Sequence, residues 1–246
     1  MNLRSCLLAP WLLVLMCGAA FGQPATADKP AVESVRPGIN DNYLDPDLNP
    51  EEWVKRFEVE SREVFRARRQ IAKICRLEPG QRVADIGAGT GLFTMIFAEQ
   101  VGPRGRVFAV DIVPKFIERI DLIAKRKGLL QVEARVVGDR DRRMPMSDVD
   151  CVFVCDVYHH FEFPTITNHA LLRLLKPGGR LIVVDFERIE GQSREFVLGH
   201  VRAGKATFRE EIEQAGFEFV REHEPAGLEE NYCLEFRRPP KQADKP

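Results

Sequence analysis

The fold is decided by the stretch VADIGAGTG at Val83–Gly91, in which an apolar run ends in three alternating glycines. This pattern predicts a buried strand before the glycines and a helix over 92–100 after them. In a parallel sheet such a loop lies at the carboxyl edge, where backbone N–H groups and a helix N-terminus can bind a ligand. Glycine also lets the backbone approach that ligand without a Cβ in the way. A tight turn without a ligand is the alternative interpretation.

Strands and helices alternate on both sides of this loop. The order predicts an α/β, doubly wound (Rossmann-like) fold: a seven-stranded, mostly parallel sheet with an antiparallel last strand and helices on both faces. Asn49-Pro50-Glu51-Glu52 begins the first helix with an N-cap, a proline and two acids. We expect strands over 82–86, 107–111, 132–137, 149–155, 180–186, 217–223 and 232–237, and helices over 51–75, 92–100, 114–127, 165–175 and 205–215.

The N-terminal residues differ in composition from the rest of the chain. Arg4 is the only charge before Asp28, and Leu7–Met16 is almost wholly apolar. A positive start, a short apolar run and small residues after it are typical of a signal peptide. We therefore expect a signal peptide at 1–22 and export, with an uncleaved anchor as the alternative. A linker or arm at 23–49, a domain at 50–238 and a disordered tail at 239–246 complete the predicted organisation.

Composition limits the classes of partner. The 246 residues carry a formal net charge of −1, whereas nucleic-acid binders usually have a clear excess of lysine and arginine. We expect no nucleic-acid partner and no stable membrane span once the signal is cleaved. The cysteines show neither disulfide spacing nor metal-ligand spacing, so they are interpreted as core thiols and no metal is predicted. The oligomeric state is left open.

The spacing of the glycines favours one cofactor over another. The dinucleotide fingerprint is G-x-G-x-x-G, but the third glycine here, Gly91, comes one residue too early. Asp85 lies two residues before the first glycine, where a carboxylate suits a ligand with an ammonium group and is poorly placed beside a pyrophosphate. S-adenosylmethionine has a zwitterionic methionine end and no phosphate. The pattern favours S-adenosylmethionine over NAD.

At this point a family resemblance can be stated. The D-x-G-x-G-x-G loop resembles the first motif of class I S-adenosylmethionine-dependent methyltransferases. Three further segments match that family in order: Val107–Asp111, Val137–Asp139 and Leu174–Gly179. The segment Asp156–Glu162 resembles the His-His segments of small-molecule members, including the quinone-biosynthesis and arsenite-type branches. The resemblance implies that Asp111 holds the ribose hydroxyls and that Asp139, or its neighbour Asp141, lies near the adenine. The full cofactor-binding set it implies is Asp85, Gly87, Ala88, Gly89, Gly91, Asp111, Ile112, Asp139, Arg140 and Asp156.

The acceptor side is expected after the fourth predicted strand, at Asp156–Glu162. His159 or His160 could act as a catalytic base near neutral pH, if the acceptor must lose a proton. Alternatively, one histidine caps the strand end and the other packs. Tyr158, His200 and Arg202 are predicted to contact the substrate, or else to be ordinary polar groups. With no separate domain for a macromolecule, a small-molecule acceptor is expected.

Three functional hypotheses follow. The first is a small-molecule methyltransferase that uses S-adenosylmethionine. The second is an exported, noncatalytic ligand-binding or interaction protein on the same scaffold, because fold does not fix function and S-adenosylmethionine is made in the cytosol. The third is a nicotinamide-dependent oxidoreductase, against which the position of Gly91 counts. The acceptor itself cannot be read from these residues.

Overall fold

The computed structural model describes residues 32–240. The predicted signal peptide at 1–22 and residues 241–246 of the predicted tail lie outside the described residues. Of the predicted arm, residues 32–49 are described, and they contain the short 3-10 helix η1 (Asp41–Tyr43). Within 32–240, no helix is both long enough and apolar enough to cross a membrane.

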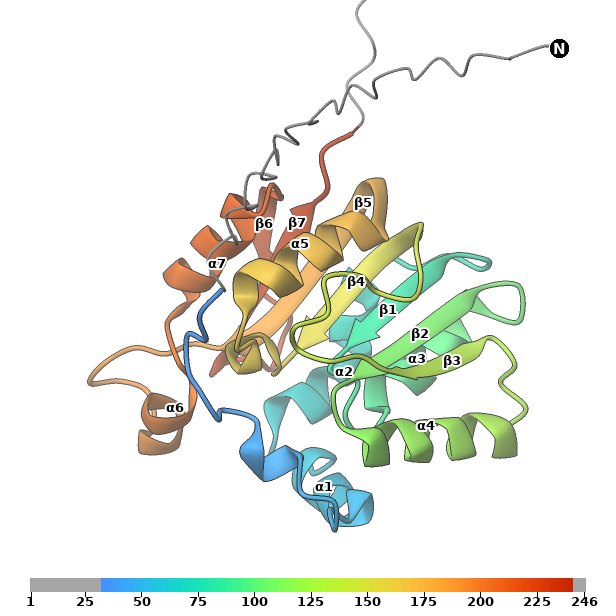
Figure 1. Cartoon of the computed structure of the whole chain (residues 1–246), viewed down its shortest axis with the longest axis horizontal. Helices are drawn as coiled ribbons and strands as arrows, with labels where there is room; N and C mark the ends of the chain where they lie inside the picture. The colour runs from blue at the N-terminus through green and yellow to red at the C-terminus, as the bar shows by residue number, and fades with distance from the viewer. Residues whose placement is uncertain (1–31, 241–246) are drawn as a thin grey trace, which may run out of the picture. The chain divides into compact units, whose positions relative to one another are not determined.

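A seven-stranded sheet in the order β3-β2-β1-β4-β5-β7-β6 forms the centre of the described chain (Figure 1). Strands β1 to β5 are parallel, and β7 runs antiparallel to both of its neighbours, β5 and β6. The predicted doubly wound sheet with an antiparallel last strand is confirmed. The strands are β1 (Arg82–Ile86), β2 (Arg106–Asp111), β3 (Val132–Val136), β4 (Val149–Cys155), β5 (Leu175–Phe186), β6 (Glu218–His223) and β7 (Asn231–Arg237).

Helices cover both faces of the sheet (Figure 1). α2, α3 and α4 pack on one face, and α5 and α7 pack on the other. The helices are α1 (Pro50–Phe57), α2 (Glu63–Ile74), α3 (Leu92–Val101), α4 (Pro114–Arg126), α5 (Pro164–Leu174), α6 (Glu195–His200) and α7 (Lys205–Gln214), and η2 (Tyr158–His160) is a second 3-10 turn.

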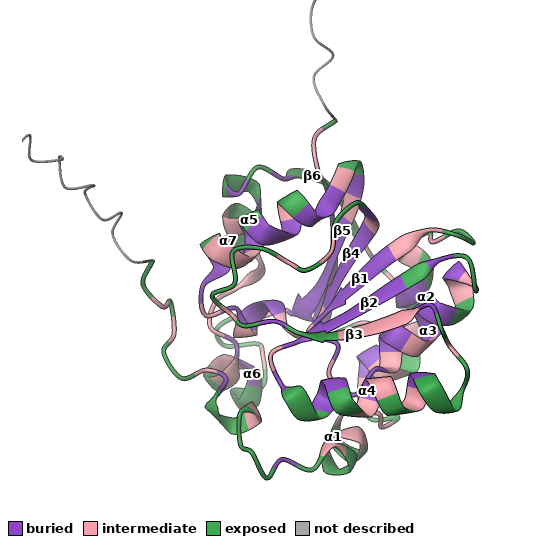
Figure 2. Ribbon diagram, turned by 45° about the vertical axis from the view of Figure 1, so that its right-hand side comes forward, coloured by how far each residue is buried: buried purple, intermediate pink, exposed green. Residues whose placement is uncertain are grey.

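The central strands are buried on both faces, which explains their continuous apolar sequences (Figure 2). Successive side chains of a strand point to opposite faces. In β4, Val152 and Val154 therefore join the cluster under α5 and α7, whereas Cys151 and Phe153 join the cluster under α2 and α3. All four side chains are fully buried.

The prediction of a single helix over 51–75 is wrong. The chain forms α1 and α2 instead, with a break at Glu58–Arg62. The two halves have different packing partners: Trp53 and Phe57 pack with Phe116 of α4, whereas Ile71 packs into the cluster with α3. One straight helix cannot place both sets of apolar side chains on their partners.

Two smaller differences concern local structure. β5 begins at Leu175, directly after α5, and not at residue 180 as predicted, so Lys176–Gly179 belong to the strand. Its backbone pairs with the chain after β7, because the amide of Gly178 donates to the carbonyl of Arg238 at 2.9 Å. The six-residue helix α6 was not predicted, since so short a segment is stabilised by tertiary contacts rather than by its own periodicity.

The cysteines of the described chain are free thiols, as expected. Cys75, Cys151 and Cys233 are buried, and Cys155 is half-buried. Burial raises the pKa of Cys75 and Cys155 well above the usual range for a thiol, and raises that of Cys233 to about 12. At neutral pH these three thiols therefore stay protonated.

The strand order fixes where a ligand can bind. β1 pairs with β2 on one side and with β4 on the other, and the crossover direction reverses between β1 and β4. In open α/β sheets, ligands bind outside the carboxyl ends of the strands at such a switch point. The ends of β1, β2, β4 and β5 meet there.

Candidate active site

A cavity of about 990 Å³ lies at this edge of the sheet, within the usual size range of small-molecule sites. Most residues predicted for the site line it. These are Asp85, Gly87, Ala88, Gly89, Asp111, Ile112, Asp139, Asp156, His159, His160 and His200. Four predicted residues do not line it: Gly91, Arg140, Tyr158 and Arg202.

The glycine loop joins β1 to α3 in a conformation that favours glycine. Gly87, Gly89 and Gly91 have φ values of +69°, +52° and +90°. A Cβ on Gly87 would lie 2.3 Å from Cγ1 of Val157, so only glycine fits. Gly91 is the N-cap of α3 and packs against Ile120, which gives it a structural rather than a ligand-facing position.

Asp111 ends β2 beside the glycine loop. One carboxylate oxygen accepts the N–H of Gly89 at 2.8 Å, and the other accepts the N–H of Val113 at 2.9 Å. Burial raises the pKa of Asp111 to about 6, and the backbone hydrogen bonds oppose that rise. Each oxygen keeps a second lone pair that can accept from a ligand hydroxyl. The carboxylate is therefore fixed in place and able to hold a diol.

Asp85 ends β1 on the other side of the loop. Its carboxylate is buried and accepts a hydrogen bond of 2.6 Å from the hydroxyl of Thr94 on α3. Burial raises the pKa of Asp85 to about 7, and the charge of Asp111 adds to the rise. A cationic ligand group beside Asp85 would relieve this desolvated carboxylate. The acid and the glycine cradle thus fit a cofactor with an ammonium group.

The two neighbouring residues Asp139 and Arg140, both predicted to bind the cofactor, lie in different surroundings. Asp139 lines the cavity, and burial raises the pKa of its carboxyl. Arg140 is exposed, and its guanidinium lies over the ring of Phe163, 4.4 Å from the ring centre. Arg140 does not line the cavity, and its contact with the cofactor stays a prediction. The alternative acid, Asp141, accepts the N–H of Gly138 at 2.8 Å.

Asp156 follows β4 with a φ of +53°, which is unusual for aspartate. Arg62, just before α2, forms an ion pair with one oxygen of its carboxylate, and the amide of Asn231 donates to the other at 2.6 Å. Asp156 lines the cavity, but both of its oxygens have protein partners. It joins α2, β4 and β7 at the cavity wall.

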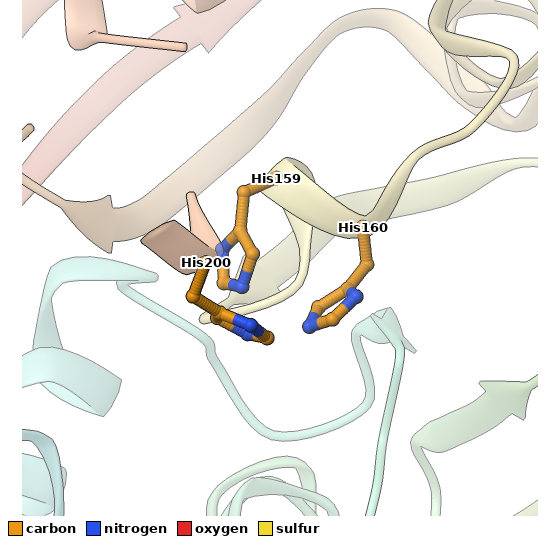
Figure 3. Close-up of side chains that lie close together, drawn as sticks. All are labelled: His159, His160 and His200. Atoms are coloured by element: carbon orange, nitrogen blue, oxygen red, sulfur yellow. The ribbon is translucent and has the colours of Figure 1, made fainter. Parts of the chain in front are cut away.

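Three histidines from two distant segments meet on the far side of the cavity (Figure 3). His159 and His160 come from η2, and His200 is the last residue of α6. One imidazole nitrogen from each lies within 4.8 Å of the other two. The ring centres of His159 and His160 are 4.3 Å apart, and His200 is about equally distant from both, at 5.0 and 4.9 Å.

His159 is the most firmly held of the three. Its Nδ1 lies 2.7 Å from a carboxylate oxygen of Asp185, and its backbone N–H donates to the second oxygen at 3.1 Å. Both side chains are almost completely buried, with exposed fractions of 1 % and 0 %. The contact with Asp185 orients the ring and leaves Nε2, which has no hydrogen-bond partner in the described chain.

The other two histidines hold little positive charge. Burial, together with the neighbouring histidines and Arg36, lowers the pKa of His160 to about 2 and that of His200 to about 4. The hydroxyl of Tyr43 lies 3.5 Å from Nε2 of His160. At neutral pH His160 and His200 are therefore uncharged imidazoles.

Two predicted substrate residues lie elsewhere. Tyr158 is fully buried, with hydrogen bonds to Asn168 at 2.7 Å and to Glu211 at 3.1 Å. Arg202 forms two hydrogen bonds with Glu211, at 2.7 and 2.6 Å. Neither lines the cavity, and both belong to a largely buried polar network around α7, so their contact with a substrate stays a prediction. Of the three, only His200 reaches the cavity.

Several residues at the site were missed in the sequence. Asp185, which contacts His159, is the second-last residue of β5, so the rule that finds an acid at a strand end would have found it. Two aromatic residues near the start of the domain, Tyr43 and Trp53, also line the cavity; Tyr43 contacts His160, and Trp53 packs with Phe116 of α4. Asn231 and Phe196 carried no signal, because β7 and α6 reach the site only through the tertiary fold.

The fold and the site define a class: a Rossmann-like domain with a glycine cradle, a strand-end acid and a second compartment beside them. A family model described as "Methyltransferase domain" matches residues 77–224, more than half of the chain, and the chain belongs to that family. It is a class I S-adenosylmethionine-dependent methyltransferase family, and its cofactor is S-adenosylmethionine.

Individual relatives agree with this assignment. The chain is 31 % identical over 125 residues to a ubiquinone/menaquinone biosynthesis C-methyltransferase of Nitrosospira multiformis, covering 50 % of each protein. It is 31 % identical over 109 residues to a protein-L-isoaspartate O-methyltransferase of Aeropyrum pernix, covering 43 % of this chain and 39 % of that protein. The match therefore spans half or less of these curated relatives.

A solved structure shares the fold. The crystal structure of a methyltransferase of Aquifex aeolicus, described as dependent on S-adenosylmethionine, superimposes with a TM-score of 0.65 at 22 % identity. The match covers 78 % of this chain and 99 % of that one. The shared architecture includes the sheet edge at which the cavity lies.

Proposed function

We propose that this protein transfers a methyl group from S-adenosylmethionine to a small-molecule acceptor. The observation that carries the proposal is one continuous cavity, with Asp85, the glycine loop and Asp111 at one side and the three histidines at the other. A donor held on the first side faces an acceptor on the second, which is the alignment that methyl transfer requires.

The donor side is built from residues that suit the cofactor. Asp111 accepts from the ribose hydroxyls, Asp85 faces the ammonium group, and the glycine loop lets the backbone approach the ligand. When bound, the cofactor supplies a methyl group on a cationic sulfur. Asp139 is the acid on the adenine side in this proposal.

The acceptor side combines aromatic side chains with the histidines and other polar groups. Tyr43, Phe186 and Phe196 line it together with Asn40 and Arg194. The aromatic side chains suit a small aromatic or apolar molecule. The names of the relatives include both a C-methyltransferase and an O-methyltransferase, so they do not decide the acceptor atom. The histidines of the site favour an acceptor group that must lose a proton.

His159 is the better of the two predicted bases. Asp185 fixes its ring and stabilises a proton on it, and its Nε2 has no protein partner. A proton taken from an acceptor hydroxyl or thiol would go to Nε2 as the methyl group arrives. His160 is a poorer base, because its pKa of about 2 leaves it little affinity for a proton.

The first test is calorimetric titration of the purified chain with S-adenosylmethionine and, separately, with NAD. We expect binding of S-adenosylmethionine alone, lost in Asp111→Ala and kept in Asp121→Ala, a half-exposed acid on α4 outside the cavity. Formation of S-adenosylhomocysteine with a panel of phenols, thiols and quinols then tests transfer. Binding without turnover would favour the noncatalytic hypothesis, and binding of NAD would favour the oxidoreductase.

We also propose that residues 1–22 direct export. The supporting observation is the charge and apolar pattern of the leader, from Arg4 to Met16. Cell fractionation with N-terminal sequencing of the product tests it, with a chain lacking 1–22 as the control. A full-length product in the cytosol would contradict export, and an intact leader in the membrane fraction would indicate an uncleaved anchor.

A further inference from the structure

The histidine cluster has more nitrogen atoms facing one point than a catalytic base requires. His159, His160 and His200 are three of the five histidines in the chain. Two come from η2, and the third comes from α6, about forty residues later, so the fold brings them together rather than local sequence. Figure 3 shows the three rings turned toward a common space.

The contact with Asp185 specifies which atom of His159 faces that space. Because Nδ1 is engaged by the carboxylate at 2.7 Å, the free atom is Nε2, which is buried and has no hydrogen-bond partner in the described chain. A buried polar atom without a partner costs free energy unless something binds it. A carboxylate behind a histidine is also the arrangement that orients metal-bound histidines.

The other two histidines are held through their main chain, and their rings contact aromatic neighbours. The amide of Asn40 donates to the carbonyl of His160 at 3.2 Å, and Arg36 donates to the carbonyl of His200 at 2.7 Å. The Tyr43 hydroxyl lies 3.5 Å from Nε2 of His160, whose Nδ1 is buried and has no hydrogen-bond partner in the described chain. The ring of His200 stacks on Phe196, with ring centres 5.0 Å apart. A turn of either ring toward a ligand therefore changes an aromatic contact but breaks no strong hydrogen bond.

We propose that His159, His160 and His200 bind a divalent transition metal, Zn²⁺ in the first instance, with the fourth position open to the cavity. Three imidazole ligands favour zinc and its neighbours over Mg²⁺ or Ca²⁺, which prefer oxygen ligands. Three protein ligands plus one open position is the pattern of catalytic zinc sites.

The geometry requires a modest contraction. Nitrogens bound to one tetrahedral zinc lie about 3.3 Å apart, given zinc–nitrogen distances of about 2.0–2.1 Å. The three nitrogens now lie within 4.8 Å of one another. Rotation of His160 and His200 about their side-chain bonds can bring them together, while His159 stays fixed on Asp185.

A bound metal would also activate the acceptor in the proposed methyl transfer, and this consequence rests on that proposed function. An acceptor hydroxyl or thiol that coordinates the open position has a lower pKa, because the ion stabilises the anion. Its proton passes to solvent, and the anion is then the nucleophile. His159 serves as a ligand rather than as the base in the metal-bound protein.

Metal binding is tested directly, on the full chain purified without a histidine tag and stripped with a chelator. Zn²⁺ is titrated in competition with a chromophoric chelator, and Co²⁺ is added separately to record its visible absorption. We expect one zinc per chain and a cobalt spectrum of four- or five-coordinate type. Loss of a group that orients a metal ligand typically weakens metal binding by about 10–100-fold. Loss of a ligand itself, in His160→Ala or His200→Ala, should therefore weaken zinc binding by at least about tenfold.

The matched control is His169→Ala, which removes an exposed histidine of α5 outside the cluster. Thermal melts verify that each variant folds. The proposal is overturned if the wild-type chain binds no stoichiometric zinc, or if the cluster variants bind zinc as tightly as the control. Asp111→Ala should keep zinc binding while losing S-adenosylmethionine, so failure of the metal site and failure of the proposed function give different results.

Discussion

The two acids of the donor side, Asp85 and Asp111, are buried carboxylates whose pKa values are raised to about 7 and about 6. The usual pKa of an aspartate side chain is 3.8, so Asp85 stays protonated to a much higher pH in the folded chain. Between about pH 4 and these values, the two acids bind more protons in the folded state than in the unfolded state. Asp85 and Asp111 therefore contribute a fall in the free energy of unfolding of the cofactor-free chain as pH rises from about 4 to 7. His160 and His200, whose pKa values are lowered, contribute with the opposite sign, so the fall should be measured as the difference between the wild type and Asp85→Asn.

Cofactor binding should release a proton from Asp85. An ammonium group beside the carboxylate stabilises its charged form, so near pH 7 a partly protonated Asp85 ionises on binding. Calorimetry in two buffers with different ionisation enthalpies measures the release, and affinity should rise with pH up to about 7. In Asp85→Asn the release should drop and binding should weaken; unchanged proton release in that variant would place the titrating group elsewhere.

Gly87 and Gly128 allow crowding to be separated from backbone strain. Both have similar positive φ values, +69° and +66°, but a Cβ on Gly87 meets Val157, whereas a Cβ on Gly128 meets nothing within 4 Å. Gly128→Ala should cost about 1 kcal/mol in free energy of unfolding from strain alone. Gly87→Ala should cost about 1–3 kcal/mol more, measured by urea unfolding. Equal losses in the two variants would show that Val157 moves aside freely.

At the scale of elements, Arg62 connects the break between α1 and α2 to the end of β4. Its ion pair with Asp156 is largely buried, with exposed side-chain fractions of 28 % and 11 %. Arg62→Met leaves Asp156 without its cation and should lower the free energy of unfolding by about 1–3 kcal/mol. Arg69→Met removes an exposed pair with Glu99 and should cost under about 0.5 kcal/mol. Similar losses in both variants would mean that Arg62 contributes only surface charge.

The sequence predicts elements well where one local pattern determines them. β4 is predicted with its observed bounds, because an apolar run that is buried on both faces has no competing interpretation. The split of the first helix is missed, because the periodicity of Trp53, Phe57 and Ile71 fits one helix as well as two. The choice between one helix and two depends on where α3 and α4 lie in the fold, which the local pattern does not contain.

The same limit applies to the site. Asp111 and Asp156 give the same signal, an acid after an apolar strand, yet Asp156 is held by Arg62 and Asn231 from remote elements. His159 and His160 are conspicuous as neighbours, whereas their partnership with His200 depends on where α6 folds. Contacts between segments far apart in the chain are the part that spacing cannot predict.

At the scale of the whole molecule, cofactor binding should raise the free energy of unfolding of the chain. A ligand that binds only the folded chain, at 100 times its dissociation constant, adds about 2.7 kcal/mol to the free energy of unfolding. For a domain of this size that corresponds to a rise in Tm of about 5–10 °C. Thermal melts should show this rise with S-adenosylmethionine in the wild type and in His200→Ala, and none in Asp111→Ala. A full rise in Asp111→Ala would remove Asp111 from the donor site.

The buried thiols have a consequence for how the folded chain meets oxidants. Exchange between thiols and disulfides requires a thiolate, and Cys75 and Cys233 are held protonated inside the fold. Disulfide reagents should therefore react slowly with these two thiols once the chain has folded, whereas Cys155 is half-buried and lines the cavity.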